Sequence, residues 1–274
     1  AAVLGTGEIW LRVPETIRIE INGKLPANVM SKDVILRIIG DLTAAGATYR
    51  ALEFTGDTVE AMSLSSRMTM ANMGIEAGAK CALFAPDEKT AEYLGIELTA
   101  AERALAGDAD APCERVLRYR AEDFVPVMAL PSNVDHVAAI RDLEPVAIDQ
   151  VFLGSCTNGR LEDLMAAAEI LKGKHIAPFV KLIVTPASRK IWEEAEANGT
   201  LAILSAAGAM ITHPSCGLCC GRTGGILSDG ERVVATNNRN FLGRMGSSKV
   251  EIYLASPKSA AASALTGRLT EATC

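Results

Sequence analysis

The segment VAIDQVFLGSCTNGRLEDLMAAAEILKG, residues 146–173, contains the pattern that decides the fold. Its first part, 146–153, is mostly apolar and predicts a buried strand that runs into a Gly-Ser loop. The part from residue 161 onward is predicted as a helix that ends at Gly173, because glycine is common just past a helix C-terminus. A strand that leads through a glycine loop into a helix is the repeating unit of a parallel α/β sheet.

Strands and helices alternate in the same way on both sides of this segment. In 31–42, apolar residues form one stripe, and Ser31 is placed to cap the helix. Further strands are predicted at 17–25, 47–56, 180–186 and 250–257, and further helices at 67–77 and 188–200. We therefore expect an α/β protein with two consecutive three-layer domains and mainly parallel sheets. The irregular, charged segment 100–124 places the boundary at 113/114, which gives domains at 24–113 and 114–274.

Composition narrows the classes of function. The chain has 274 residues, 49% of them hydrophobic, and a formal net charge of −6. An acidic chain is a poor candidate for binding nucleic acid, and no apolar run is long enough for a membrane span. The seven cysteines form an odd number in a chain that is too long for a disulfide-stapled fold, so a reduced cytoplasmic setting is expected.

The cysteines lie in two places that suit chemistry. Cys156 directly follows a predicted strand, and the carboxyl ends of parallel strands are where α/β proteins bind ligands. A buried structural cysteine is the alternative interpretation. Cys216 and Cys219 form a C-x-x-C pair, with Cys220 adjacent. This spacing fits a redox pair, a zinc site or an iron–sulfur centre, although zinc would need further ligands that the chain does not offer in a close pair.

Two more segments carry candidate polar groups. TNNRNFLGRMGSS, 236–248, has two arginines five residues apart after a predicted strand, which suits an anion site because arginine binds carboxylates in a forked geometry. A solvated loop is the alternative. In MTMANMGIEAG, 68–78, Asn72 and Glu76 share one helix face, and a carboxylate on a mainly apolar helix is a candidate acid or base. An ordinary surface pair would give the same spacing.

Three motifs in this order, GSCTNGRLEDL, HPSCGLCCGRTGGIL and TNNRNFLGRMGS, together resemble the aconitase superfamily. The closer similarity is to its large subunits of the 3-isopropylmalate dehydratase and homoaconitase type, and it runs from about residue 5 to residue 265. The resemblance implies that residues 1–23 are a strand segment of an N-terminal domain that is missing here, together with its histidine motifs. It also implies a small subunit as partner, which supplies a swivelling domain.

The resemblance also implies a cofactor and roles for single residues. A [4Fe–4S] cluster would be held by three thiolates and keep one open iron, while Cys220 packs without binding metal. The implied ligands are Cys156, Cys216 and Cys219; the implied groups near the cluster are Asn72 and Asn238; the implied substrate-binding residues are Arg239 and Arg244. Glu76 would belong to a carboxylate–histidine pair that serves acid and base steps.

The expected function is that of a hydro-lyase component that interconverts 2- and 3-isopropylmalate by dehydration and rehydration, in leucine biosynthesis. Homoaconitate or a methylmalate-type hydroxy diacid is the alternative substrate, and a non-catalytic iron–sulfur or RNA-binding module is the alternative class. Without the missing domain and the small subunit, the chain is expected to be inactive alone.

Overall fold

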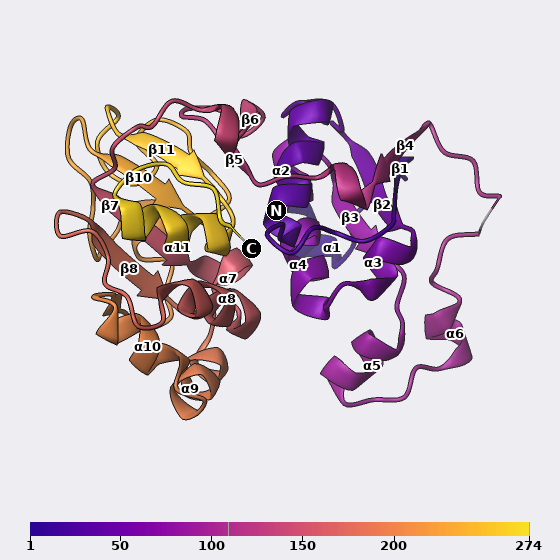
Figure 1. Cartoon of the computed structure of the whole chain (residues 1–274). Coiled ribbons are helices and arrows are strands. Elements are labelled where there is room, and N and C mark those ends of the chain that lie inside the picture. Colours follow the sequence, from indigo (N-terminus) through magenta and orange to yellow (C-terminus); the bar gives the residue numbers. More distant parts are fainter. Residues whose placement is uncertain (109, 274) are drawn as a thin grey trace.

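A computed structural model describes residues 1–108 and 110–273 of the chain, and it contains two mainly parallel sheets (Figure 1). The first sheet has four parallel strands in the order β3-β2-β1-β4. Isoleucines at 17, 19 and 21 point to the core and alternate with polar residues, as expected for strands with two different faces. The strands are β1 (Glu15–Asn22), β2 (Arg50–Thr55), β3 (Cys81–Phe84) and β4 (Arg115–Arg120).

The second sheet has seven strands in the order β6-β5-β11-β10-β7-β8-β9. The strands from β11 to β9 are parallel to one another, whereas β5 pairs antiparallel with β11 and with β6. The strands are β5 (Val127–Ala129), β6 (Val137–Ala139), β7 (Gln150–Gly154), β8 (Lys181–Thr185), β9 (Met210–Ile211), β10 (Arg232–Ala235) and β11 (Glu251–Leu254).

The helices of the first half are α1 (Ala2–Thr6), α2 (Ser31–Leu42), α3 (Asp57–Ala61), α4 (Leu64–Met73), α5 (Glu88–Leu94) and α6 (Ala100–Arg103). Those of the second half are α7 (Ser155–Asn158), α8 (Leu161–Leu171), α9 (Arg189–Ala197), α10 (Thr200–Ala206) and α11 (Pro257–Thr266). Short 3₁₀ helices are η1 (Gly74–Ala77), η2 (Ala121–Asp123), η3 (Ile140–Asp142) and η4 (Leu218–Cys220). Within the described residues, no helix has the length and apolar character needed to cross a membrane.

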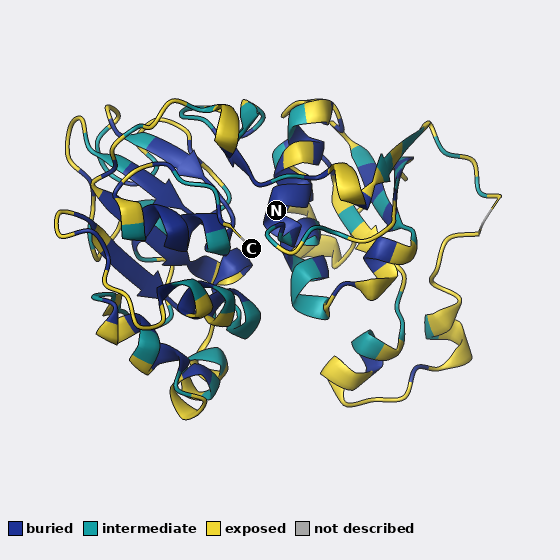
Figure 2. Ribbon diagram, viewed as in Figure 1, coloured by how far each residue is buried: buried dark blue, intermediate teal, exposed yellow. Residues whose placement is uncertain are grey.

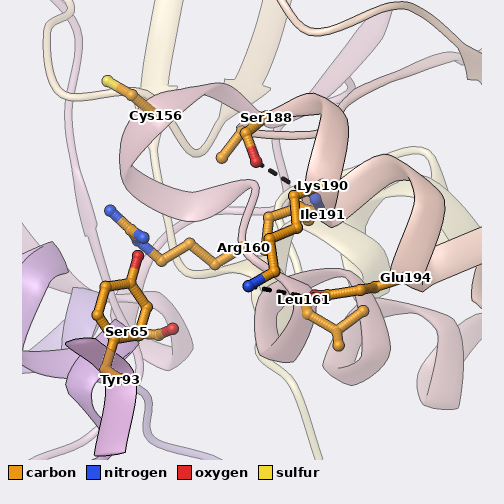
Figure 3. A pocket seen from close by; sticks show the side chains of 10 residues that line it. Ser65, Tyr93, Cys156, Arg160, Leu161, Ser188, Lys190, Ile191 and Glu194 are labelled. Carbon is orange, nitrogen blue, oxygen red and sulfur yellow. Dashed lines mark hydrogen bonds and ion pairs between the residues drawn. The ribbon is translucent and has the colours of Figure 1, made fainter. Parts of the chain in front are cut away.

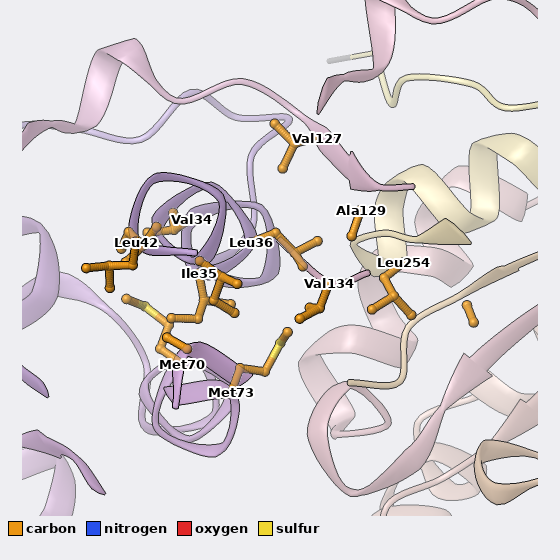
Figure 4. Close-up of a cluster of buried hydrophobic side chains, with 14 of the residues drawn as sticks. Val34, Ile35, Leu36, Leu42, Met70, Met73, Val127, Ala129, Val134 and Leu254 are labelled. Carbon is orange, nitrogen blue, oxygen red and sulfur yellow. The ribbon is translucent and has the colours of Figure 1, made fainter. Parts of the chain in front are cut away.

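Two hydrophobic cores hold these layers together. The first core joins the first sheet, α2, α4 and one face of the second sheet, so that Leu36 of α2 and Leu254 of β11 belong to the same cluster (Figure 4). The second core lies between the other face of the second sheet and the helices α8, α10 and α11. Figure 2 shows that buried residues are concentrated in α2 and in the strands of the second sheet. Because α2 is covered by both sheets, it connects the two halves of the molecule.

The expected fold class is confirmed, with mainly parallel sheets in both halves. The strand pairing differs from the expected domain limits at residue 23 and at the 113/114 boundary. β1, which falls within 1–23, is hydrogen-bonded between β2 and β4 in the first sheet. β4 lies beyond residue 113, yet it pairs with β1 along its whole length. Its sequence, RVLRYR, is too charged to predict a strand, and in the fold it is a partly exposed strand at the edge of the sheet.

Helix limits differ in smaller ways. The helix expected at 67–77 starts earlier, at Leu64, because Ser63 caps it by accepting a hydrogen bond from Ser66 N, and its last turn is the 3₁₀ helix η1. Ser31 is the first residue of α2 and not its cap. Met30 holds the cap position, and the Asp33 carboxylate accepts the Met30 N–H. α8 ends at Leu171, close to the predicted end at Gly173, and α9 ends at Ala197, within the predicted range 188–200. Gly173 and Gly199, just beyond these helices, both have positive φ.

Candidate functional site

The candidate site lies where two neighbouring strands of the second sheet end. β7 and β10 are parallel and adjacent, with Ala235 opposite Phe152. Just beyond this pair, Thr236 Oγ1 donates to Gly154 O at 3.1 Å and accepts from Gly154 N at 2.8 Å. These bonds keep the loop that starts at Ser155 beside the loop that starts at Thr236. The sequence analysis placed Cys156 in the first loop and Asn238 and the arginines in the second.

Gly154 makes the sharp turn from β7 into α7 possible. Its φ is 145°, a conformation that residues with a side chain rarely adopt, and a Cβ at this position would lie 2.1 Å from Thr185 O. Ser155 follows with a φ of 78°, which is also unusual for a residue other than glycine. The turn therefore presents Cys156 at the edge of the sheet, where its side chain is exposed.

The side chains of Asn72 and Cys156 lie next to each other. Asn72, on α4, donates through Nδ2 to Thr157 Oγ1 at 2.6 Å, and the same nitrogen lies 3.8 Å from Cys156 Sγ. Residues from the two halves of the chain thus meet at this sulfur. An amide N–H directed at a sulfur is the kind of neighbouring contact that orients a metal-binding thiolate.

The turn with the other three cysteines packs against the arginine loop. Arg244 Nε donates to Cys219 O at 2.6 Å, and Arg244 Nη2 lies 3.6 Å from Cys219 Sγ. Cys220 Sγ instead points back into its own turn, where it donates to the carbonyl oxygens of Cys216 and Gly217 at 3.5 and 3.6 Å. Cys219 and Cys220 therefore have different surroundings, with the cationic partner at Cys219.

Glu76 and Arg239 form an ion pair with each other. Arg239 Nε donates to Glu76 Oε1 at 2.9 Å, and the Glu76 side chain is 11% exposed. The pair joins η1 to the loop after β10 across 163 residues of sequence. Next to it, Asn238 Oδ1 is buried and has no hydrogen-bond partner among the described residues. A buried acceptor without a partner is unusual and marks a place where a further group can bind.

The arrangement of His, Cys, Asp and Glu side chains bears on whether the site can hold a metal. Within residues 1–108 and 110–273, no group of three or more His, Cys, Asp or Glu side chains could hold a metal ion. The complete ligand set of Cys156, Cys216 and Cys219 therefore stays a prediction. The local chemistry nevertheless fits thiolate ligands, because Asn72 and Arg244 direct N–H groups at the sulfurs of Cys156 and Cys219.

A pocket of about 440 Å³ lies beside Cys156 and is lined by residues from both halves of the chain (Figure 3). Arg160, two residues past Asn158, extends along it toward Tyr93 of α5 (Figure 3). Arg160 Nε is buried and has no hydrogen-bond partner among the described residues. Lys190 adds a second cation, 3.9 Å from Glu194. Arg160 stands within the GSCTNGR motif, but no local pattern indicates that it borders a pocket.

Lys32 is a buried charged residue beside the candidate site that the sequence pattern did not indicate. It belongs to the first turn of α2, is 0% exposed, and its Nζ donates to the carbonyl oxygens of Thr236 and Asn237 at 2.9 and 2.8 Å. Burial lowers the pKa of Lys32 to about 7, although the acidic groups of Asp163, Cys219, Glu76 and Asp33 oppose this shift. The apolar stripe that predicts α2 does not include Lys32, so it gives no indication that this lysine is buried among polar partners.

Fold and site together define an α/β protein whose parallel strands present cysteine, asparagine and arginine side chains at one carboxyl edge. The chain belongs to the aconitase family (aconitate hydratase). The sequence profile of this family matches residues 1–146 and 136–267. This confirms the expected superfamily.

Individual relatives agree on one type of protein. The chain is 49% identical over 271 residues to "3-isopropylmalate dehydratase large subunit 1" of Methanopyrus kandleri. It is 46% identical over 272 residues to "3-isopropylmalate dehydratase large subunit 2" of Archaeoglobus fulgidus, and 45% identical over 269 residues to "3-isopropylmalate dehydratase large subunit" of Heliobacterium modesticaldum. These alignments cover 98–99% of the chain and 64–65% of the relatives. The chain thus spans slightly less than two-thirds of their length.

Proposed function

We propose that this chain is the part of a 3-isopropylmalate dehydratase large subunit that binds the iron–sulfur cluster. The strongest support is a pair of N–H donors that point at cysteine sulfurs. Asn72 Nδ2 lies near Cys156 Sγ, and Arg244 Nη2 lies near Cys219 Sγ, on two different loops beside the second sheet. Membership of the aconitase family and the names of the relatives give the reaction class. The substrate proposed is a branched hydroxy diacid, and the reaction is its isomerisation by loss and regain of water.

The proposed ligands are Cys156, Cys216 and Cys219. A [4Fe–4S] cluster held by three thiolates supplies one open iron that polarises a substrate hydroxyl or carboxylate oxygen. Cys220 is left out because its sulfur bonds to carbonyl groups of its own turn. All six cysteines in the described part of the chain are free, which suits a reducing compartment such as the cytoplasm.

The remaining residues would bind and orient the substrate. Arg239 and Arg244 carry guanidinium groups that suit the two carboxylates of a diacid. Asn238 has a buried amide oxygen without a partner, so it has a free acceptor for a substrate hydroxyl or a bound water. Glu76 would hold or release a proton at its carboxylate, and the ion pair with Arg239 keeps that carboxylate in place.

A small subunit is proposed as the partner, because the relatives are named as large subunits. It would complete the binding site together with the further length of chain that the relatives have. The net charge of −6 gives no support to a nucleic-acid partner.

Anaerobic purification followed by iron and sulfide counting tests this proposal. The wild-type chain should contain iron and sulfide in nearly equal amounts and absorb visible light. Cys156→Ser should lose the cluster, because only two thiolates would remain, whereas Cys220→Ala should keep it. Zinc in place of iron, or full iron content in Cys156→Ser, would contradict the assignment. Adding the small subunit and the rest of the large subunit, with isopropylmalate, homoaconitate and methylmalate compared, then tests the substrate.

A further inference from the structure

The first turn of α2 contacts the loop after β10, at the sheet edge that carries the candidate site. Lys32 Nζ donates to the carbonyl oxygens of Thr236 and Asn237, which are the two residues directly before Asn238 and Arg239. The bonds measure 2.9 and 2.8 Å, and the whole lysine is excluded from solvent. A side chain from the first half of the molecule therefore fixes the backbone of a loop in the second half.

Asp33, the next residue, anchors the same turn at a second point. Its Oδ2 accepts from Met30 N at 2.8 Å, and its Oδ1 accepts from Val127 N of β5 at 3.2 Å. Both charged residues of this turn are 0% exposed. The turn that carries Lys32 is thus held to β5 by a bond of its neighbour Asp33, so its backbone position does not depend on Lys32 alone.

Asn237 extends the connection from Lys32 to the groups that are expected to act. Its carbonyl accepts from Lys32, while its side-chain Nδ2 donates to Cys219 O at 3.5 Å and to Arg239 O at 3.3 Å. Asn237 is itself 0% exposed. Two steps of hydrogen bonding thus lead from Lys32 to the cysteine turn and to the arginine that pairs with Glu76.

A buried lysine is costly as a purely structural element. Moving an ammonium group out of water carries a desolvation penalty that an apolar residue of similar volume avoids. Leucine or methionine would fill the same space in this core without that penalty. The placement is better explained by what the ammonium does, since it donates hydrogen bonds to two carbonyls that no apolar side chain could hold.

We propose that Lys32 is a positioning residue of the candidate site, which fixes the loop of residues 236–246 and, through Asn237, the turn of Cys219. The inference rests on the proposed function for what the loop binds, but the order of the loop can be measured without any cofactor. It predicts that loss of the two donors loosens the loop selectively and leaves the sheet beneath it intact.

Hydrogen exchange on the metal-free protein provides the test, with Lys32→Met as the variant. The amides of residues 237–246 should exchange at least about tenfold faster, as expected for loss of hydrogen bonds from a charged donor, while those of β8 keep their rates. Lys258→Met is the matched control, because it also removes a lysine bond to a main-chain carbonyl, that of Ala27, at an exposed position. It should change neither segment.

Lys32→Arg retains the donors and the charge, and it carries the test if Lys32→Met does not fold. Its loop exchange should stay within about threefold of wild type. In reconstituted protein, Lys32→Met should lose iron to a chelator at least about tenfold faster than wild type, and Lys32→Arg should not. Equal acceleration of loop and β8 in Lys32→Met, or a loop as loose in Lys32→Arg as in Lys32→Met, would overturn the proposal. A wild-type chain that binds no iron would refute the proposed function and leave the exchange result decisive for Lys32.

Discussion

Arg244 illustrates how a single residue holds the cysteine turn. Its guanidinium donates to Cys219 O and approaches Cys219 Sγ, and it also lies over the Phe241 ring, 5.5 Å from the centroid. Lysine offers one compact ammonium group and cannot make both contacts at once with the same geometry. Arg244→Lys should therefore release iron several-fold faster from the reconstituted chain, as measured with a chelator under anaerobic conditions.

The control for this change is Arg222→Lys, at an exposed arginine that follows the same cysteine turn. It removes the same functional group without touching Cys219 and should release iron at the wild-type rate. Equal rates for Arg244→Lys and wild type would show that the guanidinium contacts do not hold the turn.

Asp163 links the site to the pH dependence of stability. Burial raises its pKa to about 7, although Asn158 Nδ2 and Arg160 N donate to it and Lys32 lies near. The folded pKa is above the unfolded value of about 4, so the folded chain binds more protons between these values, and its stability falls as pH rises through this window. Above about pH 7 the full cost of a buried carboxylate applies.

Asp163→Asn removes this titration, so its free energy of unfolding should depend less on pH. The advantage of the wild type over the variant should shrink by up to about 3 kcal/mol between pH 5 and pH 8. Urea unfolding at the two pH values measures this, and Glu169→Gln, at an exposed position of the same helix, serves as the control for loss of a carboxylate. A wild-type advantage that grows with pH would contradict the assignment.

Some of these residue-scale features could be predicted from the sequence and others could not. The place of Cys156 followed from a strand that ends in a glycine loop, because such a pattern is local. Asn238 was named by the family resemblance. The Lys32 bonds to the loop after β10 could not be foreseen, since they join residues 204 and 205 positions apart. The Glu76–Arg239 pair is equally remote in sequence, and the family resemblance assigned its members to other partners.

At the scale of elements, the turn from β7 into α7 depends on Gly154. Alanine would have to adopt a φ of 145° and would place its Cβ 2.1 Å from Thr185 O. The change combines backbone strain with a clash against main chain, so we expect Gly154→Ala to lower the free energy of unfolding by about 3 kcal/mol or more. Urea unfolding monitored by circular dichroism measures the loss.

Gly173→Ala is the matched control for this element. Gly173 also has positive φ, 71°, but a Cβ there would meet nothing within 4 Å. Its cost should be about 1 kcal/mol, that of the left-handed conformation alone. Similar losses in both variants would mean that the crowding at Thr185 does not constrain the turn.

Among whole elements, α2 was predicted from the regular spacing of its apolar residues, and β7 from a continuous apolar run. β4 was missed because three of its six residues are arginines, and its place in the sheet is decided by β1, about a hundred residues earlier. Strand pairing of this kind follows from tertiary contacts, which no local window contains.

For the whole molecule, the first core predicts that both halves unfold together. Leu36 of α2 is 0% exposed and lies in this core near Leu254 of the second sheet (Figure 4). Phe152 of β7 belongs to the same cluster. Leu36→Ala leaves a cavity between the two sheets and should cost about 2–5 kcal/mol. Because α2 contacts both halves, that cost should be felt equally by reporters in each.

Trp192 of α9 packs beside the second core, remote in sequence from α2, and Trp10 is 87% exposed. Tryptophan fluorescence therefore reports mainly on the second half during urea unfolding, while circular dichroism reports on both. Leu36→Ala should shift the two transitions to the same lower midpoint. Leu204→Ala, a buried leucine of the second core, should do the same. A fluorescence midpoint that stays at the wild-type value in Leu36→Ala would show that the halves unfold independently and that α2 does not couple them.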